Sequence, residues 1–365
     1  MRVRCLVLLF TLFVPAAAYA QAADEALEAG FAALQKNDGD RAATAFRRAL
    51  SAEPDNPAAL YGAGAAAYLQ GRHTEAIAFL KRTLSVEPRI IQASALLGEI
   101  AYHQGDLALA IKTYENALAL APGNVPLRER LATWRSESAV HDNFRAFKDD
   151  RFTILFEGPA NRVLAERATT VLREAFFRIG QTLGAYPPNP INVIFYTGRQ
   201  FSDLTGAPEW SAGRFDGQIR MPVAGATQNL REFDRILTHE LTHAMLASIA
   251  ARNVPAWLNE GLAMYFDGND AVASEKRLAA AHVYVPLANL QGGFGGLTTL
   301  QATVAYQISA FATNALLTRI GPANLAVLLQ DLDRGIPMDT AVQRYGVSLP
   351  EFEAGLAKRV GVAGR

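Results

Sequence analysis

The sequence predicts a multidomain protein in which an all-α solenoid of helical repeats precedes an α+β domain. Three observations support this prediction. A set of small and apolar residues recurs every 34 positions in the first third of the chain, segments typical of β-strands begin only after Asp150, and helical patterns dominate again toward the C-terminus. At 365 residues, half of them apolar, the chain is long enough for two or three domains with a core each.

The charge balance argues against a polyanionic partner. Lysine plus arginine and aspartate plus glutamate number 35 each. Such a chain has no large basic surface with which to hold nucleic acid or an anionic membrane. We therefore expect no nucleic-acid partner.

Residues 1–20 have the pattern of a secretory signal peptide. Arg2 and Arg4 precede an apolar run from Cys5 to Val14, and Ala18-Tyr19-Ala20 supplies a small-x-small cleavage site. A membrane anchor is the alternative, but the run is too short to span a bilayer, and no later apolar segment is long enough. We expect cleavage near Ala20 and export to the periplasm or the medium. The mature chain would then contain no cysteine, so a metal site would use histidines and carboxylates.

The 34-residue period defines three units over residues 22–124. Small residues in each unit permit close packing of two antiparallel helices, and a proline follows the second helix and ends it. A generic helical bundle is the alternative, which five recurring columns disfavour. The pattern resembles tetratricopeptide repeats, which implies a protein partner, and residues 125–140 are expected to form a capping helix or linker. The columns are Gly30, Gly64, Gly98; Ala42, Ala76, Ala110; Phe46, Leu80, Tyr114; Leu50, Leu84, Leu118; and Pro54, Pro88, Pro122.

The second domain is expected over residues 141–360 and mixes strands with helices. Strand composition predicts strands at 151–157, 191–196 and 218–223. Apolar periodicity predicts helices at 161–183, 199–205, 229–251 and 255–266, followed by three helices within 301–360.

The predicted helix 229–251 contains His239-Glu240-Leu-Thr-His243. Positions i and i+4 lie on one helix face, so both imidazoles can reach one ion. Zn²⁺ accepts neutral imidazole nitrogen and is tetrahedral with an open position in catalytic sites. The pentapeptide also occurs by chance, and a surface histidine pair is the alternative interpretation.

A carboxylate follows in the next predicted helix, at Glu260 within Trp257-Leu-Asn-Glu-Gly-Leu-Ala263. A buried glutamate without a partner is unfavourable, which favours a third metal ligand. A salt bridge to a core arginine is the alternative.

Together these motifs resemble the gluzincin metallopeptidases, in particular the peptidase-MA-like domains, over about residues 150–355. The resemblance implies a zincin-like α+β fold, with His239, His243 and Glu260 as zinc ligands and Glu240 as general base. The sequence lacks the third histidine of metzincins and the Gly-x-Met-Glu-Asn motif of the aminopeptidases. Recognition of a substrate amino terminus is therefore unsupported.

Three weaker features accompany the site. Tyr306 could donate to the oxyanion of a tetrahedral intermediate, or simply pack in the core. Residues 220–223 are expected at a sheet edge that binds a substrate backbone, unless they form only an edge blunted by Pro222. The glycine-rich segment 292–296 lacks the Lys-Ser/Thr of a phosphate loop, so it is interpreted as a flexible rim or lid.

The sequence thus predicts an exported zinc metalloendopeptidase, in which a zinc-activated water hydrolyses peptide bonds and the repeats recruit a protein. The alternative is a repeat scaffold whose peptidase-like domain binds peptide or metal with little turnover. An intact Glu240 favours the enzyme.

Overall fold

The computed structural model describes residues 16–158, 160–206, 212–249 and 253–362. The expected signal peptide lies mostly outside them, since only residues 16–20 are included, as the start of the first helix. Contacts divide the chain into two compact units, one ending at Trp134 and the other running from Arg135, with His103–Gly105 grouped with the second. No helix among the described residues is both long and apolar enough to cross a bilayer.

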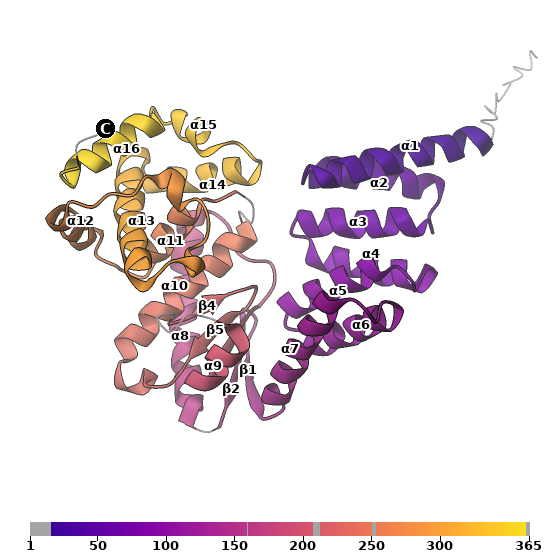
Figure 1. Cartoon of the computed structure of the whole chain (residues 1–365), viewed down its shortest axis with the longest axis horizontal. Helices are drawn as coiled ribbons and strands as arrows, with labels where there is room; N and C mark the ends of the chain where they lie inside the picture. The colour runs from indigo at the N-terminus through magenta and orange to yellow at the C-terminus, as the bar shows by residue number, and fades with distance from the viewer. Residues whose placement is uncertain (1–15, 159, 207–211, 250–252, 363–365) are drawn as a thin grey trace, which may run out of the picture. The chain divides into compact units, whose positions relative to one another are not determined.

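The first unit consists of helices that pack in sequential pairs, as expected for repeats (Figure 1). The glycine column has a steric reason. A Cβ added at Gly98 would lie 2.5 Å from the Tyr114 ring, and one at Gly30 would lie 2.6 Å from the Phe46 ring. The first helix of each repeat therefore needs glycine opposite the large residue of the second. The helices are α1 (Ala16–Gln35), α2 (Gly39–Ala52), α3 (Pro57–Leu69), α4 (His73–Val86), α5 (Ile91–His103) and α6 (Leu107–Leu120).

Helix α7 (Val125–His141) covers the apolar end of the last repeat, where a capping helix was expected. Its Trp134 is fully buried and stacks on Tyr102, with ring centroids 4.9 Å apart. The ring of Tyr114 lies 4.3 Å from Trp134. The helix then continues beyond Trp134 into the second unit.

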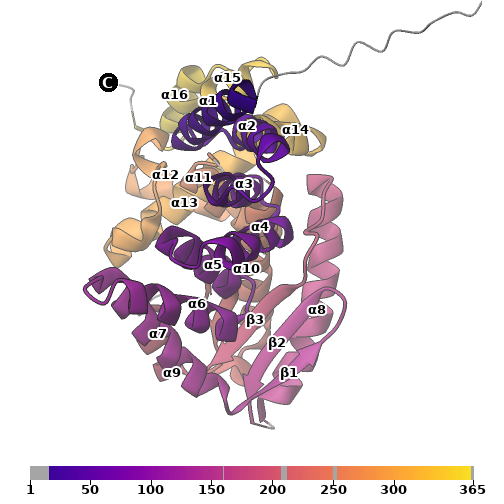
Figure 2. The same cartoon turned by 90° about the vertical axis from the view of Figure 1, so that its right-hand side faces the viewer.

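The second unit is built on a mixed sheet with the strand order β1-β2-β3-β5-β4, and Figure 2 shows β1, β2 and β3 side by side. Strands β2, β3 and β5 are parallel, whereas β1 and β4 join the two sides antiparallel. The bounds are β1 (Phe144–Lys148), β2 (Phe152–Glu157), β3 (Ile191–Tyr196), β4 (Arg214–Phe215) and β5 (Ile219–Pro222).

The expected edge strand at residues 220–223 is wrong in its position. Strand β5 pairs with β3 on one side and with β4 on the other, so β4 forms that edge. The side chain of Arg220 is accordingly buried. A two-residue strand such as β4 has too little apolar alternation to be recognised in the sequence.

Helices supply most of the remaining fold of the second unit. Helix α8 packs against β2 and α10, and α11 and α12 both pack against α13 (Figure 1). Strand β1 and helix α12 were not expected, and four helices rather than three follow residue 298 in the described chain. The bounds are α8 (Ala160–Leu183), α9 (Gly198–Thr205), α10 (Leu230–Ile249), α11 (Ala256–Phe266), α12 (Ala271–Ala281), α13 (Thr299–Ile320), α14 (Leu325–Asp333), α15 (Met338–Gln343) and α16 (Leu349–Arg359).

Candidate metal centre

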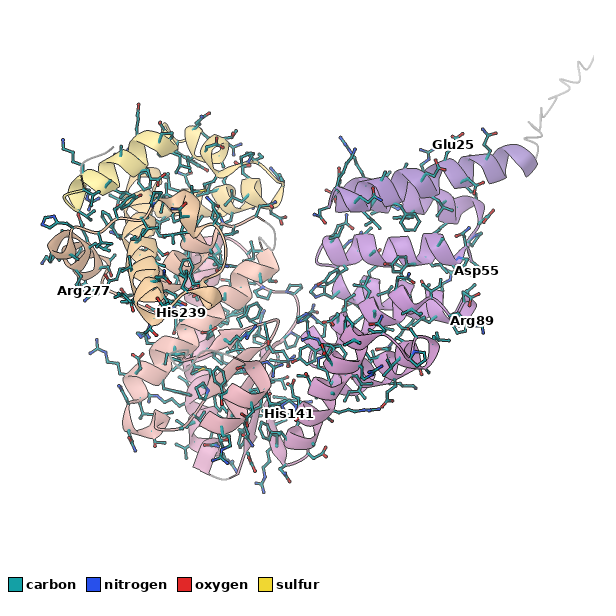
Figure 3. The ribbon with its side chains drawn as sticks, viewed as in Figure 1. Glu25, Asp55, Arg89, His141, His239 and Arg277 are labelled. Carbon is teal, nitrogen blue, oxygen red and sulfur yellow. The ribbon has the colours of Figure 1, made fainter. Side chains whose placement is uncertain are left out.

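Two helices bring the three predicted ligands together. His239 and His243 lie one turn apart on α10, and Glu260 lies on α11. The Oε2 atom of Glu260 is 3.4 Å from the Nε2 atom of each histidine. Figure 3 labels His239 among the helices of the second unit. The spacing of i and i+4 on α10 thus gives the convergence that the sequence predicts.

The other nitrogen of each imidazole is already held. The Nδ1 atom of His239 lies 3.0 Å from Asp267 Oδ2, and that of His243 lies 2.8 Å from Asn259 Oδ1. Arg235 Nη1 donates to the same oxygen of Asp267 at 2.6 Å. Because Nδ1 donates to these oxygens, Nε2 is the nitrogen of each ring that can bind an ion once the ring is neutral.

A carboxylate oxygen without a hydrogen bond supports the fit to a metal. Glu260 Oε2 is buried and has no hydrogen-bond partner among the described residues. The three ligand atoms lie within 4.8 Å of one another, and this is the only such group found in the described part of the chain. Two imidazoles and one carboxylate form a donor set that suits Zn²⁺. The residues present therefore fit a divalent metal.

Glu240 follows His239 on α10 and is buried beside the ligands. The backbone at Gly213, just before β4, runs directly over its carboxylate. A Cβ at Gly213 would lie 2.8 Å from Glu240 Oε1 and 2.9 Å from its Cγ. The φ angle of Gly213 is not positive, so close approach rather than backbone conformation requires glycine here.

Close packing of two helices explains why a glycine, Gly261, follows the third ligand. Helix α11 packs tightly on α13 at this point. A Cβ at Gly261 would lie 2.0 Å from Thr313 Oγ1 and 2.4 Å from the Ser309 carbonyl oxygen. Glycine therefore lets α11 approach α13 closely and fixes the position of Glu260.

The buried imidazoles and carboxylates of the site shift one another's pKa values. Burial disfavours the charged imidazole, but the hydrogen bond to Asp267 and the adjacent Glu260 outweigh it and raise the pKa of His239 to about 10. Burial alone would raise the pKa of the Glu260 carboxyl, but the adjacent His243 and His239 outweigh it and hold that pKa well below the usual range. Burial also raises the pKa of Glu240, despite the neighbouring imidazoles.

Tyr306 lies about two turns into α13 and is half-buried. Burial raises the pKa of its hydroxyl, and the negative charges of Glu260 and Glu240 raise it further. The hydroxyl thus stays protonated at neutral pH and keeps its ability to donate. Its ring also packs on Phe294, with centroids 5.4 Å apart, so a packing contact and a donor near the site coexist.

Two residues of the site were missed in the sequence. Asn259 directly precedes Glu260, and Asp267 follows it by seven positions. Seven residues make about two helical turns, so Asp267, the C-cap residue of α11, falls on the same side of the helix as Glu260. That spacing is the signal by which it could have been found.

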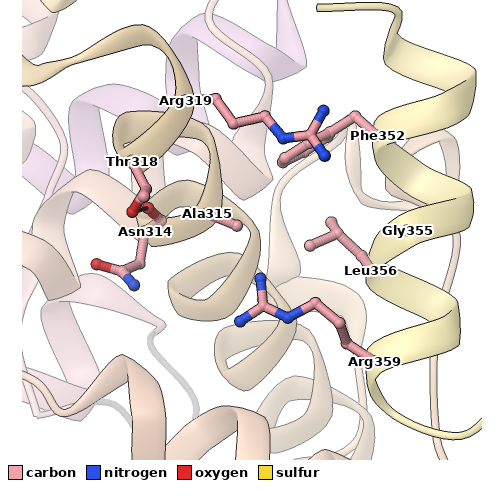
Figure 4. Close-up of a pocket in the computed structure, with 8 residues that line it drawn as sticks. All are labelled: Asn314, Ala315, Thr318, Arg319, Phe352, Gly355, Leu356 and Arg359. Carbon is pink, nitrogen blue, oxygen red and sulfur yellow. Dashed lines mark hydrogen bonds between the residues drawn. The ribbon is translucent and has the colours of Figure 1, made fainter.

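A separate surface groove lies between α13 and α16, with a cavity volume of about 220 Å³ (Figure 4). It shares no lining residue with the metal centre. Its two arginines are engaged: the Arg319 guanidinium lies 5.6 Å from the Phe352 ring centroid, and Arg359 is paired with Glu275 at 2.6 Å.

The fold and the site define a helical-repeat protein that carries a His-His-Glu centre in an α+β domain. Comparison with family models agrees on both units. The model described as Peptidase MA superfamily matches residues 171–359, and the chain belongs to this family. Two tetratricopeptide repeat models match residues 27–90 and 92–124. The group formed by His239, His243 and Glu260 agrees with the metal dependence typical of that superfamily.

No curated protein matches the chain. Among solved structures, the first TPR of Spaghetti (RPAP3) bound to the HSP90 peptide SRMEEVD is 21% identical, covering 33% of this chain and 97% of that one with a TM-score of 0.31. The first TPR domain of human RPAP3 is 20% identical, and the match covers 34% of this chain and 97% of that one with a TM-score of 0.32. A Thermobaculum terrenum O-GlcNAc transferase mutant is 13% identical, and the match covers 93% of this chain and 94% of that one with a TM-score of 0.28.

Proposed function

We propose that the chain is a zinc-dependent endopeptidase whose repeats bind a protein partner or substrate. One observation carries the proposal: Glu260 Oε2, which has no hydrogen-bond partner among the described residues, lies 3.4 Å from both Nε2 atoms, with the buried carboxylate of Glu240 adjacent. His239, His243 and Glu260 would hold the metal. A Zn²⁺ ion there supplies Lewis-acid chemistry, since it polarises carbonyl groups and increases the acidity of water.

Glu240 is suited to act as the general base. Its raised pKa brings the carboxylate nearer to neutral pH, where acceptance and return of a proton are both feasible. In the proposed reaction Glu240 accepts a proton from the attacking water and delivers it to the leaving amine. The Tyr306 hydroxyl donates a hydrogen bond to the oxyanion as charge develops on it.

Strand β4 offers a place for the substrate backbone. It is the outer strand of the sheet on the side of Glu240, and the preceding Gly213 touches that carboxylate. An extended peptide that pairs with an edge strand receives backbone hydrogen bonds without strict sequence requirements. This favours extended protein segments as substrates.

The N-terminal pattern supports a proposal of export, with cleavage near Ala20. Edman sequencing of the protein recovered from its native compartment tests it. A mature chain that begins at Gln21 is expected, and a chain that retains Arg2 and Arg4 contradicts it.

A first prediction tests the mechanism. Glu240→Gln should retain about one zinc per chain but lose hydrolysis of an unfolded protein such as casein, because an amide cannot accept the proton. His239→Ala, His243→Ala and Glu260→Ala should lose the zinc itself. Elemental analysis and a peptide-release assay measure both quantities, and the exposed Glu174→Gln on α8 is the matched control.

The same experiment separates the enzyme from the alternative, a scaffold that binds peptide without turnover. A scaffold would leave wild type and Glu240→Gln equally inactive while both bind zinc. Equal, substantial hydrolysis by both proteins would refute the role of Glu240.

A further inference from the structure

The segment Gln291–Thr298, here called the strap, joins the short helix η2 (Leu287–Leu290) to α13. Both of its ends are fixed. The Ala256 N–H at the start of α11 donates to the Gln291 carbonyl at 3.1 Å. At the other end, Thr298 caps α13 in a reciprocal pair with Gln301.

The four glycines of the strap have no steric or conformational requirement in this structure. Gly292, Gly293, Gly295 and Gly296 are exposed, and none has a positive φ. A Cβ at any of them would meet nothing within 4 Å among the described residues. Glycine loses more conformational entropy on ordering than other residues, so these glycines weaken the conformation that they adopt.

Phe294 stands between the two glycine pairs and is the one strap side chain that is almost fully buried, with 4% of its surface exposed. Its ring meets the Tyr306 ring edge-on at 86°. The Leu297 N–H donates to the Phe294 carbonyl at 3.0 Å and closes a tight turn. Phe294 belongs to the hydrophobic core of the second unit, and Leu297 packs against that core. The apolar side chains at positions 294 and 297, together with the 3-10 turn η3 (Phe294–Gly296), thus seat the middle of the strap, whereas its four glycines stay exposed.

We propose that the strap hinges at Gly292-Gly293 and Gly295-Gly296, and that Phe294, when seated, is a positioning residue for Tyr306. In the seated state the ring of Phe294 fixes the side chain of Tyr306, and in the open state it uncovers that face of α13. The catalytic consequence rests on the proposed function. The hinging itself does not.

Hydrogen exchange of the full chain tests the hinge without reference to activity. Amides of residues 292–297 should exchange more than tenfold faster than those in the middle of α13, because they open locally. Replacing all four glycines by alanine should slow strap exchange by about twofold to fivefold per substitution, since alanine fits this conformation and restricts the open one. Gly355→Ala in α16, which also has no neighbour within 4 Å, is the control and should leave the strap unchanged.

Two results would overturn the hinge. One is strap exchange as slow as that of α13 in the wild type. The other is unaltered strap exchange in a folded quadruple alanine variant.

The positioning role is tested by placing 3-fluorotyrosine at Tyr306. Phe294→Leu keeps apolar volume and should fold, but it removes the aromatic edge. We expect the ¹⁹F resonance to shift or broaden in Phe294→Leu and to sharpen in the quadruple alanine variant. A resonance identical in all three proteins overturns the positioning role.

Kinetics then test the link to the reaction. Phe294→Leu should lower kcat with little change in KM, and its effect should not multiply with that of Tyr306→Phe, because both act through one hydroxyl. Independent, multiplicative effects overturn the link. A wild type without peptidase activity refutes the proposed function, whereas exchange and ¹⁹F spectra still decide the strap.

Discussion

His239 is held on both sides by acidic groups: Glu260 faces its Nε2 and Asp267 accepts from its Nδ1. Arg235 in turn donates to Asp267, so the orientation of one ligand depends on a chain of charged residues. Such outer contacts fix the tautomer and the ring plane of a metal-binding histidine. They also decide how many protons leave when a metal arrives.

The second prediction concerns those protons. With a pKa of about 10, His239 is protonated in the metal-free protein at pH 7.5, whereas zinc requires the neutral ring. Zinc binding should therefore release on the order of one proton, and apparent affinity should rise with pH up to that pKa. Calorimetry at pH 7.5 in PIPES and in HEPES, which bind zinc weakly and differ in ionisation enthalpy, measures the release. Identical binding enthalpies in the two buffers contradict it.

The third prediction concerns the glycine above the base. Alanine at Gly213 would place a methyl group 2.8 Å from Glu240 Oε1. The side chain of Glu240 is flexible enough to move, so we expect little loss of stability but a turnover at least tenfold lower, since a general base contributes about 10²–10⁴ in rate. Zinc content should stay near one per chain, as measured by elemental analysis. Wild-type turnover in Gly213→Ala would show that the carboxylate tolerates the methyl group.

At the scale of elements, the site depends on how closely α10, α11 and α13 pack. The ligands on α10 follow from helical spacing alone, which is why the sequence predicts them. Glu260 was likewise predicted from its motif, but the need for glycine at Gly261 depends on the contact with α13, a helix that begins almost 40 positions later. Local patterns carry no information about such a contact.

The strands show the same limit. The apolar runs of β2 and β3 are recognisable because both are largely buried. Strand β1 is exposed along most of its length, and β4 has two residues, so neither has a periodic signal. Helix α12 was missed because it buries only Ser274 and Leu278. The order of strands, and with it the true edge, required the structure.

The fourth prediction tests the contact between α11 and α13. Gly261→Ala forces a methyl group against the backbone oxygen of Ser309, which cannot move aside as a side chain could. Overpacking of this kind destabilises by about 1–3 kcal/mol, and zinc affinity should fall as α11 shifts. Gly355→Ala, in open space on α16, should instead stabilise slightly. Thermal melts and chelator competition compare the two, and equal melting temperatures would contradict the role of Gly261.

At the scale of the whole molecule, α7 is common to both compact units. Leu127, Leu131 and Trp134 lie in the core of the repeats, whereas Glu137 belongs to the second unit. Glu137 and Arg220 are each 1% exposed and lie 2.6 Å apart. Residues 135–141 of α7 thus belong to the second unit, and Glu137 contributes to its interior.

The fifth prediction follows from this buried pair. Glu137→Ala should destabilise the full chain by about 3–5 kcal/mol, because it leaves the Arg220 guanidinium buried with less compensation. Adding Arg220→Met should recover most of the loss, since an apolar side chain needs no counter-charge. Urea unfolding measures both variants. Additive destabilisation in the double variant would show that the pair is not coupled.

Domains are usually exchanged between proteins at exposed linkers. Here the sequence passes from one unit to the other within an unbroken helix. If everything up to His141 were replaced by foreign repeats, Glu137 would be lost and Arg220 of β5 would lose its partner at 2.6 Å. If the replacement ended before Val125, α7 would be kept whole, but its apolar face would have to pack against the foreign repeats. An exchange of the repeats that preserves both cores would therefore have to keep α7 whole and match its apolar face to the new array.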